Sequence, residues 1–469
     1  MDKEQLSKFN PGKLFGILPG ITKNEIAEML HTTPSAIKLF EKAYADNILS
    51  DEALNHNAKT AAAKNNFDQE IIQDNLKKII EKITDELLAQ TEVLSYNGQV
   101  LSRKTFATQY DTPVTPEDLA DIPTELRPQL TGNYLSRDCD GNTAQTLLYF
   151  YKQWQDGEDE QTKQHAYHMF RQGLDILDLD SITWKILGMN KNAMGFWFPE
   201  LVNAIKRQSF FKAPKTTIAK VPVTLLQLTR LQYENLTPIS KLIANQFCMR
   251  AFDLDVTQDY FIKTGTFSSK FDFRNAKVTG QSEVETLGEY LLFIQNQACL
   301  MAGSLSGHPM YGASTTNEWV VREFIHDKED NPSIYMGLPL HTEYRAFVDF
   351  NTASVIDVIP YWHPDIMKDR FGNAPDSDNP HMQHDWIIYT QHENKLMDRF
   401  NQNKDLVANK LTNILLDFNL TGQWSIDIMQ NGDDFYIIDM ALAANSALTQ
   451  FLPPNSIRPI KEDWMPRLN

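Results

Sequence analysis

Two aspartates in the C-terminal third are spaced for metal chemistry. Asp427 and Asp439 interrupt the apolar runs QWSIDIM and DDFYIIDMAL, and Asn431-Gly432, a strong hairpin signal, lies between the runs. The two carboxylates are therefore expected on adjacent antiparallel strands. There they can converge on one divalent cation, and oxygen ligands suit Mg²⁺ that also grips phosphate oxygens. The alternative is that each aspartate only faces water on an edge strand.

Two lysines upstream flank a loop of small residues. Lys263 lies in the strand-like run DYFIKTG, and the loop TGTFSS separates it from Lys270. Backbone N–H groups in such a loop can approach a phosphate closely, and the ammonium groups can neutralise it. The alternative is that the lysine side chains extend to solvent.

Two arginines also lie inside apolar and aromatic runs. Arg322 is in VVREFI and Arg345 is in EYRAFV. A planar, permanently charged guanidinium in such a strand needs a carboxylate or phosphate partner. Glu323 or Glu343 would give a purely structural ion pair. Alternatively, the arginines reach into a cleft and stabilise charge that develops on a transferred phosphoryl group.

Strands bounded by turn signals must position these side chains. The runs DYFIKTG, KFDFRNAKVTG, NEWVVREFI, TEYRAFVDF and SVIDVIPYW all have strand composition, in addition to the two that carry the aspartates. A further hairpin is predicted to turn through residues 351–354. The loop HPDIMKDRFGNAPDSDNPHMQHD is long enough for a substrate lid, and its three histidines, His363, His381 and His384, are interpreted as solvated side chains rather than metal ligands.

The rest of the chain is predicted to be mainly helical. Residues 1–50 contain a helical hairpin, EIAEMLHTTPSAIKLFEK, which resembles a helix-turn-helix but lacks a basic recognition face, so contact with a protein partner is favoured. Residues 51–130 contain a long amphipathic helix over 65–90 and an acidic, Pro-rich linker over 111–128. Residues 131–250 are expected to be mainly helical, with the option of a small α/β layer.

Composition excludes several classes of protein. The chain has 469 residues and a net charge of -17, which opposes non-specific nucleic-acid binding, although the basic cluster AIKRQSFFKAPKTTIAK leaves a local acidic or nucleic-acid partner open. No apolar run approaches the roughly 20 residues of a membrane span, and the N-terminal residues lack a signal core. A cytoplasmic protein without membrane contact is expected. Three widely separated cysteines indicate neither a disulfide framework nor a zinc site.

The order of these motifs resembles the ATP-grasp superfamily. A strand lysine, a small-residue loop with a second lysine, the VVREFI and EYRAFV strands and a terminal hairpin with two acids follow one another between residues 253 and 452. The stretch resembles the branch named for two arginines and a lysine, and it is also similar to the ATP-grasp chaperones of eukaryotic translation-initiation-factor assembly. The resemblance implies an α/β (α+β) ATP-grasp domain over residues 251–455, after helical modules, with ATP and Mg²⁺ as cofactors.

The resemblance also implies roles for individual residues. Lys263 and Lys270 would contact the ATP phosphates, and Arg345 would stabilise the γ-phosphate or an acyl-phosphate intermediate. Asp427 and Asp439 would be the metal ligands. The segment that holds adenine between the two lobes would be Glu323, Phe324 and Ile325.

One departure from the family pattern concerns the metal site. The second acid is usually followed two residues later by asparagine, whereas this chain has Asp439-Met440-Ala441. Asn445 in the next turn is the candidate for the missing ligand. The departure affects full magnesium coordination, and therefore turnover.

These features predict an ADP-forming ATP-grasp ligase that activates a carboxylate as an acyl phosphate, with Lys270, Arg322 and Arg345 as catalytic residues. The acceptor would be an unidentified carboxylate or protein. The first alternative is an ATP-binding assembly chaperone or interaction module that does not turn ATP over. The second is a nucleic-acid ligase or nucleotidyltransferase, since Lys270-Phe271-Asp272 has part of the motif of those enzymes, although Phe273 replaces the glycine expected next. A DNA-binding regulator is opposed by the acidic charge.

Overall fold

The computed structural model describes residues 80–96 without 82 and 86, residues 158–159, 161–162 and 188, and residues 190–226, 238–302, 316–372 and 380–458. The chain divides into two compact units, and the second unit contains the described residues 94–96, 190–218, 259–278, 297–302, 316–372 and 380–458. The predicted N-terminal hairpin, most of the 65–90 helix and the 111–128 linker lie outside the described residues. The domain boundaries therefore stay predictions.

The described part of the first unit is helical. It contains α12 (Val223–Leu226), α13 (Pro238–Ala251), α14 (Gly280–Glu285) and the beginning of α15 (Leu287–Ala302). α13 and α15 pack at close range, because a Cβ on Gly288 would lie 2.4 Å from the carbonyl of Ala244. Asn245 and Glu289 join the same helices, since Asn245 Nδ2 donates to Glu289 Oε1 at 3.1 Å and Glu289 N donates to Asn245 Oδ1 at 3.0 Å.

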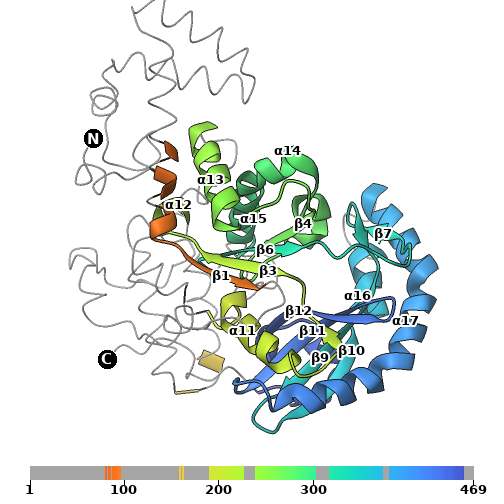
Figure 1. The fold of residues 1–469 in the computed structure, drawn as a ribbon. Coiled ribbons are helices and arrows are strands. Elements are labelled where there is room, and N and C mark those ends of the chain that lie inside the picture. The colour runs from red at the N-terminus through yellow and green to blue at the C-terminus, as the bar shows by residue number, and fades with distance from the viewer. Residues whose placement is uncertain are drawn as a thin grey trace, which may run out of the picture. The chain divides into compact units, whose positions relative to one another are not determined.

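Two five-stranded sheets hold the strands predicted from the sequence (Figure 1). The first has the order β1 (Glu92–Tyr96), β3 (Thr216–Lys220), β6 (Glu318–Glu323), β4 (Tyr260–Thr264) and β5 (Lys277–Val278). The second has the order β10 (Ser354–Pro360), β9 (Thr342–Asp349), β11 (Gln423–Asn431), β12 (Asp434–Leu442) and β2 (Phe211–Lys212). Together with the helices they make the chain a mixed α/β protein.

One face of the second sheet is buried in a large hydrophobic core, and the other carries charged residues as well as the smaller apolar cluster around Phe347 and Ile359. Helices α11 (Met194–Ile205) and α17 (Pro380–Leu415) lie near this sheet in Figure 1, and residues of both helices share a hydrophobic core with its strands. Tyr344, Ala346, Ile426 and Ile428 belong to this core and are fully buried. Because side chains alternate along a strand, the residues between them point away from this core, and they carry the charged groups described below.

Both predicted hairpins are confirmed. β9 and β10 pair antiparallel around residues 350–353, and β11 and β12 pair antiparallel around Gly432, whose φ of +64° suits glycine. No described helix is long and apolar enough to cross a membrane.

Two local predictions are wrong. The run KFDFRN was predicted as a strand but forms the 3₁₀ helix η5 (Lys270–Asn275), because Ser269 turns the chain at a φ of +48° and Phe273 N donates to Tyr335 O at 3.0 Å. The predicted loop after His363 begins with α16 (Pro364–Met367) and η6 (Lys368–Gly372), and α17 starts at its far end. Pro364 and Pro380 explain both starts, since proline suits the first turn of a helix.

Candidate nucleotide-binding site

A cavity lies within the second unit, and its empty space is about 790 Å³ when the open solvent at its mouth is included. Strands β4 and β6 of the first sheet and β9, β11 and β12 of the second contribute to its walls. It brings together nearly all the residues predicted to bind ATP. Its lining includes Lys263, Lys270, Arg322, Glu323, Phe324, Ile325, Asp427 and Asp439, and also Glu343 and His341.

A β-bulge shapes the wall formed by β11 and β12. Asp427 is the register partner of Asp439, whereas the next pair is Ile428 with Ile437, so Ile438 is an extra residue on β12. Arg322 Nη1 donates to the carbonyl oxygen of Ile438 at 2.8 Å. The bulge therefore places both Ile438 and Asp439 on the cavity wall, and its carbonyl anchors an arginine from the other sheet.

Each of the two aspartates faces a basic residue. Arg345 on β9 donates through Nε and Nη2 to the two carboxylate oxygens of Asp427, both at 2.7 Å. Lys263 Nζ lies 3.1 and 3.2 Å from the two oxygens of Asp439. The Asp427 pair is bidentate and largely buried, whereas 40% of the Asp439 side chain is exposed. The prediction that these aspartates face each other across a hairpin is confirmed, and their metal role stays a prediction.

The cavity contains buried cations beside its carboxylates. Lys263 is 1% exposed and Arg322 is 5% exposed; the carboxylate of Asp439 acts electrostatically on both, and Glu323 also acts on Arg322. Burial lowers the pKa of Arg322 to about 10 and also lowers the pKa of Lys263, where the neighbouring Arg322 adds to the effect. Burial disfavours the charged forms of these two side chains, so an anionic ligand beside them would stabilise those forms.

Lys270, the first residue of η5, also lines the cavity. Its Nζ donates to the hydroxyl of Tyr361, and the ammonium lies 4.0 Å from the centre of the Tyr361 ring. The guanidinium of Arg345 lies 4.8 Å from the same ring. Burial lowers the pKa of Lys270, but Tyr361, Glu343 and Asp427 outweigh this effect and raise it. Tyr361 was not predicted from the sequence, because its contact with Lys270 spans 91 residues.

Glu343 is a buried carboxyl whose environment the sequence did not show. It lies two residues before Arg345 on β9, on the same strand face, but Arg345 pairs with Asp427 instead. Glu343 Oε2 is buried without a hydrogen-bond partner. Burial raises the pKa of this carboxyl to about 7, against the opposing effect of Lys270.

The predicted adenine-holding segment follows β6. Lys215 N donates to Glu323 Oε1 at 2.8 Å, and Glu323 N donates to Lys215 O at 2.9 Å. This glutamate therefore links β6 to the residue that precedes β3. Phe324 N donates to Asp259 O at 3.1 Å. Phe324 and Ile325 line the cavity, as do the apolar residues Phe261, Phe273, Leu338 and Met429.

Asn445 is not among the cavity-lining residues. It ends the 3₁₀ helix η7 (Ala443–Asn445), and its Oδ1 accepts a hydrogen bond from Asn192 Nδ2 at 3.0 Å. The Oδ1 of Asn192 accepts a hydrogen bond from Leu442 N at 2.8 Å. The amide that was expected to complete the metal site therefore joins the end of β12 to the turn before α11.

The remaining candidates have structural explanations. His363 caps α16, where its Nδ1 accepts from Asp365 N at 3.3 Å, and its ring stacks on Phe451. The imidazole of His384 is mostly exposed, and the side chain of His381 lies outside the described part. Among the described residues, no group of three histidine, cysteine or acidic side chains could hold a metal ion.

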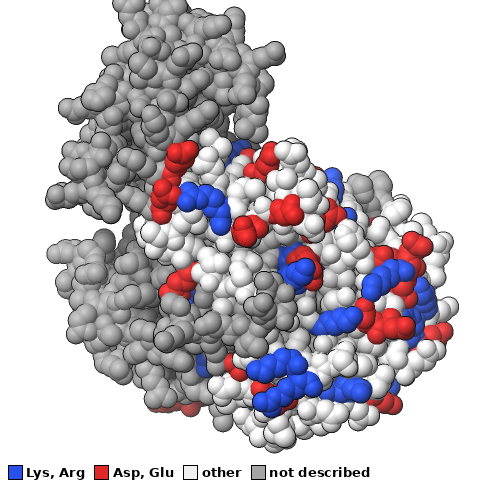
Figure 2. Space-filling model, viewed as in Figure 1, with Lys and Arg blue, Asp and Glu red and all other residues white. Residues whose placement is uncertain are grey.

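The basic cluster is partly neutralised. Arg207 lies 3.6 Å from Asp417, and Lys212 pairs with Asp434 at 2.6 Å. Lys328 pairs with the other oxygen of Asp434, also at 2.6 Å. Figure 2 shows acidic and basic side chains interspersed over the described part of one face. These ion pairs favour the solvated-surface interpretation for Arg207 and Lys212, whereas Lys220 of the same cluster is fully buried.

The Glu343 carboxyl predicts a pH effect on stability. Between the unperturbed pKa of 4.5 and the folded-state pKa of about 7, the folded state keeps a proton that the unfolded state has lost. Stability therefore falls as pH rises through this window, with a limiting slope of about 1.4 kcal/mol per pH unit from this group. Glu343→Gln should remove that contribution. Urea unfolding at about pH 5 and about pH 8 measures the difference, and an equal pH dependence in both proteins would contradict the assignment.

Comparisons with known proteins give limited similarity. No protein-family model matches the chain, and no curated protein shows significant similarity. Among solved structures, Cdc123 from Schizosaccharomyces pombe has 11% identity and a TM-score of 0.31, over 56% of this chain and 88% of that chain. The C-terminally truncated form of Cdc123 has 11% identity and a TM-score of 0.29, over 54% and 83%. At this level the likeness does not determine function, which is inferred below from the cavity.

Proposed function

We propose that the cavity binds Mg-ATP in the manner of an ATP-grasp protein. The observation that carries the proposal is that the buried cations Lys263 and Arg322, together with Lys270, share one cavity with several apolar and aromatic side chains. A nucleotide combines both characters, because its triphosphate is anionic and its base has apolar faces. Lys263, Lys270 and Arg322 would contact phosphate oxygens, and the base would lie between Phe324 and Met429.

The two aspartates fit Mg²⁺ by their chemistry. Carboxylate oxygens are hard ligands, and Mg²⁺ is usually held by one or two carboxylates together with substrate phosphates and water. Asp439 is the more accessible of the pair, whereas both oxygens of Asp427 accept from Arg345. When bound, the ion would neutralise charge on the phosphates. Arg345 would at the same time be able to donate to a terminal phosphate from beside Asp427.

In the ligase function predicted from the sequence, a carboxylate oxygen of the acceptor attacks the γ-phosphorus and ADP leaves. An amine or other nucleophile then attacks the acyl carbon, and inorganic phosphate leaves. Lys270, Arg322 and Arg345 would stabilise the charge that develops on the transferred group. These residues line or adjoin the cavity, so they are available for such a role.

One observation favours the alternative, an ATP-binding assembly or interaction module without turnover. Asn445, the candidate third ligand, is hydrogen-bonded to Asn192 and is not part of the cavity lining. The metal would then depend on two carboxylates, both already paired with basic residues. Such a site can hold Mg-ATP while it positions the metal poorly for phosphoryl transfer.

The test is to measure Mg-ATP binding by calorimetry and then to identify the nucleotide released after incubation with carboxylate-containing acceptors. We expect saturable Mg-ATP binding with little release. Stoichiometric ADP release that depends on the acceptor would establish the ligase instead, and AMP release would establish nucleotidyl transfer. Absence of binding at millimolar ATP would overturn the proposal.

A further inference from the structure

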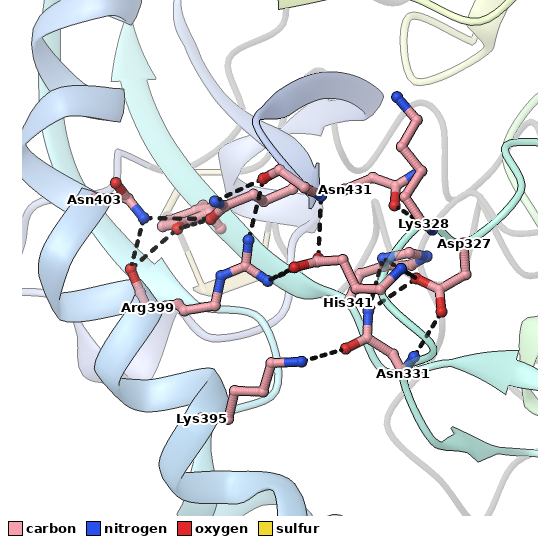
Figure 3. Close-up of polar contacts among 12 residues, drawn as sticks. Asp327, Lys328, Asn331, His341, Lys395, Arg399, Asn403 and Asn431 are labelled. Atoms are coloured by element: carbon pink, nitrogen blue, oxygen red, sulfur yellow. Dashed lines mark hydrogen bonds and ion pairs between the residues drawn. The ribbon is translucent and has the colours of Figure 1, made fainter.

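The segment that follows β6 is fixed by residues that do not line the cavity. Asn431, at the turn between β11 and β12, is fully buried. Its Nδ2 donates to His326 O at 2.9 Å, and its Oδ1 accepts from Lys328 N at 3.0 Å (Figure 3). One side-chain amide therefore pairs with two backbone groups of the segment, as a neighbouring strand would.

A charged pair fixes the same segment at Glu329, the residue after Lys328. Arg399 on α17 donates through Nη1 to both oxygens of Glu329 at 2.7 Å and through Nη2 to Gly432 O at 3.1 Å. Gly432 N in turn donates to Glu329 Oε2 at 3.0 Å. The two side chains are 17% and 20% exposed, so water weakens the pair less than it weakens a surface pair.

A third set of contacts links the segment to the cavity wall. Asp327 accepts from Asn331 N at 2.6 Å and from Asn331 Nδ2 at 2.9 Å, which closes a tight turn. Lys395 of α17 donates to Asn331 Oδ1 at 3.0 Å. His341 lies 3.4 Å from Asn331 Nδ2 and also lines the cavity. The segment is therefore held by α17, by the β11–β12 turn and by the residues next to the cavity.

We propose that Asn431 and Arg399 are positioning residues for the nucleotide base. The inference deepens the proposed function and depends on it, since the residues they hold, 326–329, directly follow Phe324 and Ile325. Neither positioning residue lines the cavity. They act by fixing the backbone that carries the base-contacting side chains, whereas Lys263, Lys270 and Arg322, which are expected to contact phosphate, are held by other contacts.

The arrangement also explains why the contacts of Asn431 and Gly432 with the segment lie where β11 turns into β12. Asn431 ends β11, residues 432 and 433 join it to β12, and these strands carry Asp427 and Asp439. The same turn therefore sets the distance between the base-holding segment and the two carboxylates. A ligand that reaches both, as a nucleotide with its metal would, gains affinity from this fixed distance because less freedom is lost on binding.

The test compares a ligand that has the base with one that lacks it. Arg399→Met keeps an unbranched apolar stem and removes the guanidinium, and Glu329→Gln removes the charge of its partner. For each variant, the dissociation constants of Mg-ATP and of Mg-tripolyphosphate are measured by calorimetry. Mg-ATP affinity should fall about tenfold, because the base-contacting segment would then have to be ordered on binding, whereas Mg-tripolyphosphate affinity should not change.

The matched control is Lys328→Met. Lys328 lies on the same segment and pairs with Asp434, but its side chain is 56% exposed and it forms no side-chain contact with α17 among those described. It should leave both affinities unchanged. The double variant Glu329→Gln with Arg399→Met should lose no more affinity than either single variant, because the two changes remove one interaction. Asn431→Ala, with its thermal unfolding followed in parallel, should give the same selective loss.

The outcomes separate the two proposals. If the wild-type protein binds neither ligand, the proposed function fails and the positioning role fails with it. If the wild-type protein binds both ligands and Arg399→Met leaves the ratio of the two affinities unchanged, only the positioning role is overturned. An equal loss of both affinities would also overturn it, since it would indicate a general structural effect.

Discussion

Asp439→Ala is expected to abolish the effect of Mg²⁺ on ATP binding. In the wild-type protein, Mg²⁺ should increase ATP affinity, because the ion links the phosphate oxygens to the carboxylates of Asp439 and Asp427. Without Asp439, the increase should fall on the order of 100-fold, at least the size reported for loss of outer-shell partners of a metal site. Calorimetric titrations with ATP in excess Mg²⁺ and in excess EDTA give the two affinities.

The same variant should bind metal-free ATP at least as well as the wild-type protein. Lys263 and Arg322 lose their nearby negative charge, so their attraction for the phosphates increases. Asp433→Ala is the matched control, since it removes the same charge from an exposed position of the same hairpin. A Mg²⁺ effect that persists in Asp439→Ala would contradict the metal site.

The local strand and turn patterns predicted much of the second unit. Alternation of apolar and polar residues located β9, β11 and β12, and Asn-Gly located the turn between the last two. The placement of Asp427 and Asp439 on adjacent antiparallel strands followed from the sequence, but a strict two-residue period from the turn would pair Asp427 with Ile438, and only the bulge at Ile438 brings Asp427 opposite Asp439. The lysines and arginines needed one further premise, that charged groups inside apolar strands must face a partner.

Features that depend on long-range contacts could not be predicted. The bulge at Ile438 follows from pairing between two strands, and no residue type marks it. Tyr361 and Arg399 reach their partners across 91 and 70 residues. Asn445 illustrates the same limit. Its sequence distance from Asp439 suggested a metal ligand, but its Oδ1 accepts a hydrogen bond from Asn192, which is 253 residues away in the sequence.

Lys263→Met should lose nucleotide affinity without losing stability. Lys263 is 1% exposed, and burial lowers its pKa, which means that the folded state binds a proton there less tightly than the unfolded state does. The charged form therefore destabilises the folded state at neutral pH. Methionine has a similar length and needs no solvation, and replacement of buried charges by well-packed apolar groups is often neutral or stabilising by about 1–4 kcal/mol.

The partner left behind does not reverse this effect. Loss of one member of a buried ion pair is costly when the other stays buried, but 40% of the Asp439 side chain reaches solvent and the basic Arg322 lies nearby. Urea unfolding should therefore give a free energy of unfolding equal to or above that of the wild-type protein. ATP affinity should fall by about 10-fold to 100-fold, the equivalent of one charge-assisted hydrogen bond to phosphate.

Lys277→Met provides the comparison for this variant. Lys277 lies near the rim of the same cavity, where its ammonium is 4.4 Å from the centre of the Phe324 ring, but it does not line the cavity. Its loss should leave phosphate affinity nearly unchanged. If Lys263→Met destabilises the protein and keeps its ATP affinity, the lysine is a structural ion-pair partner. If it is stable and binds ATP weakly, a buried charge that costs stability is retained for the anion, which is the behaviour expected of a binding residue.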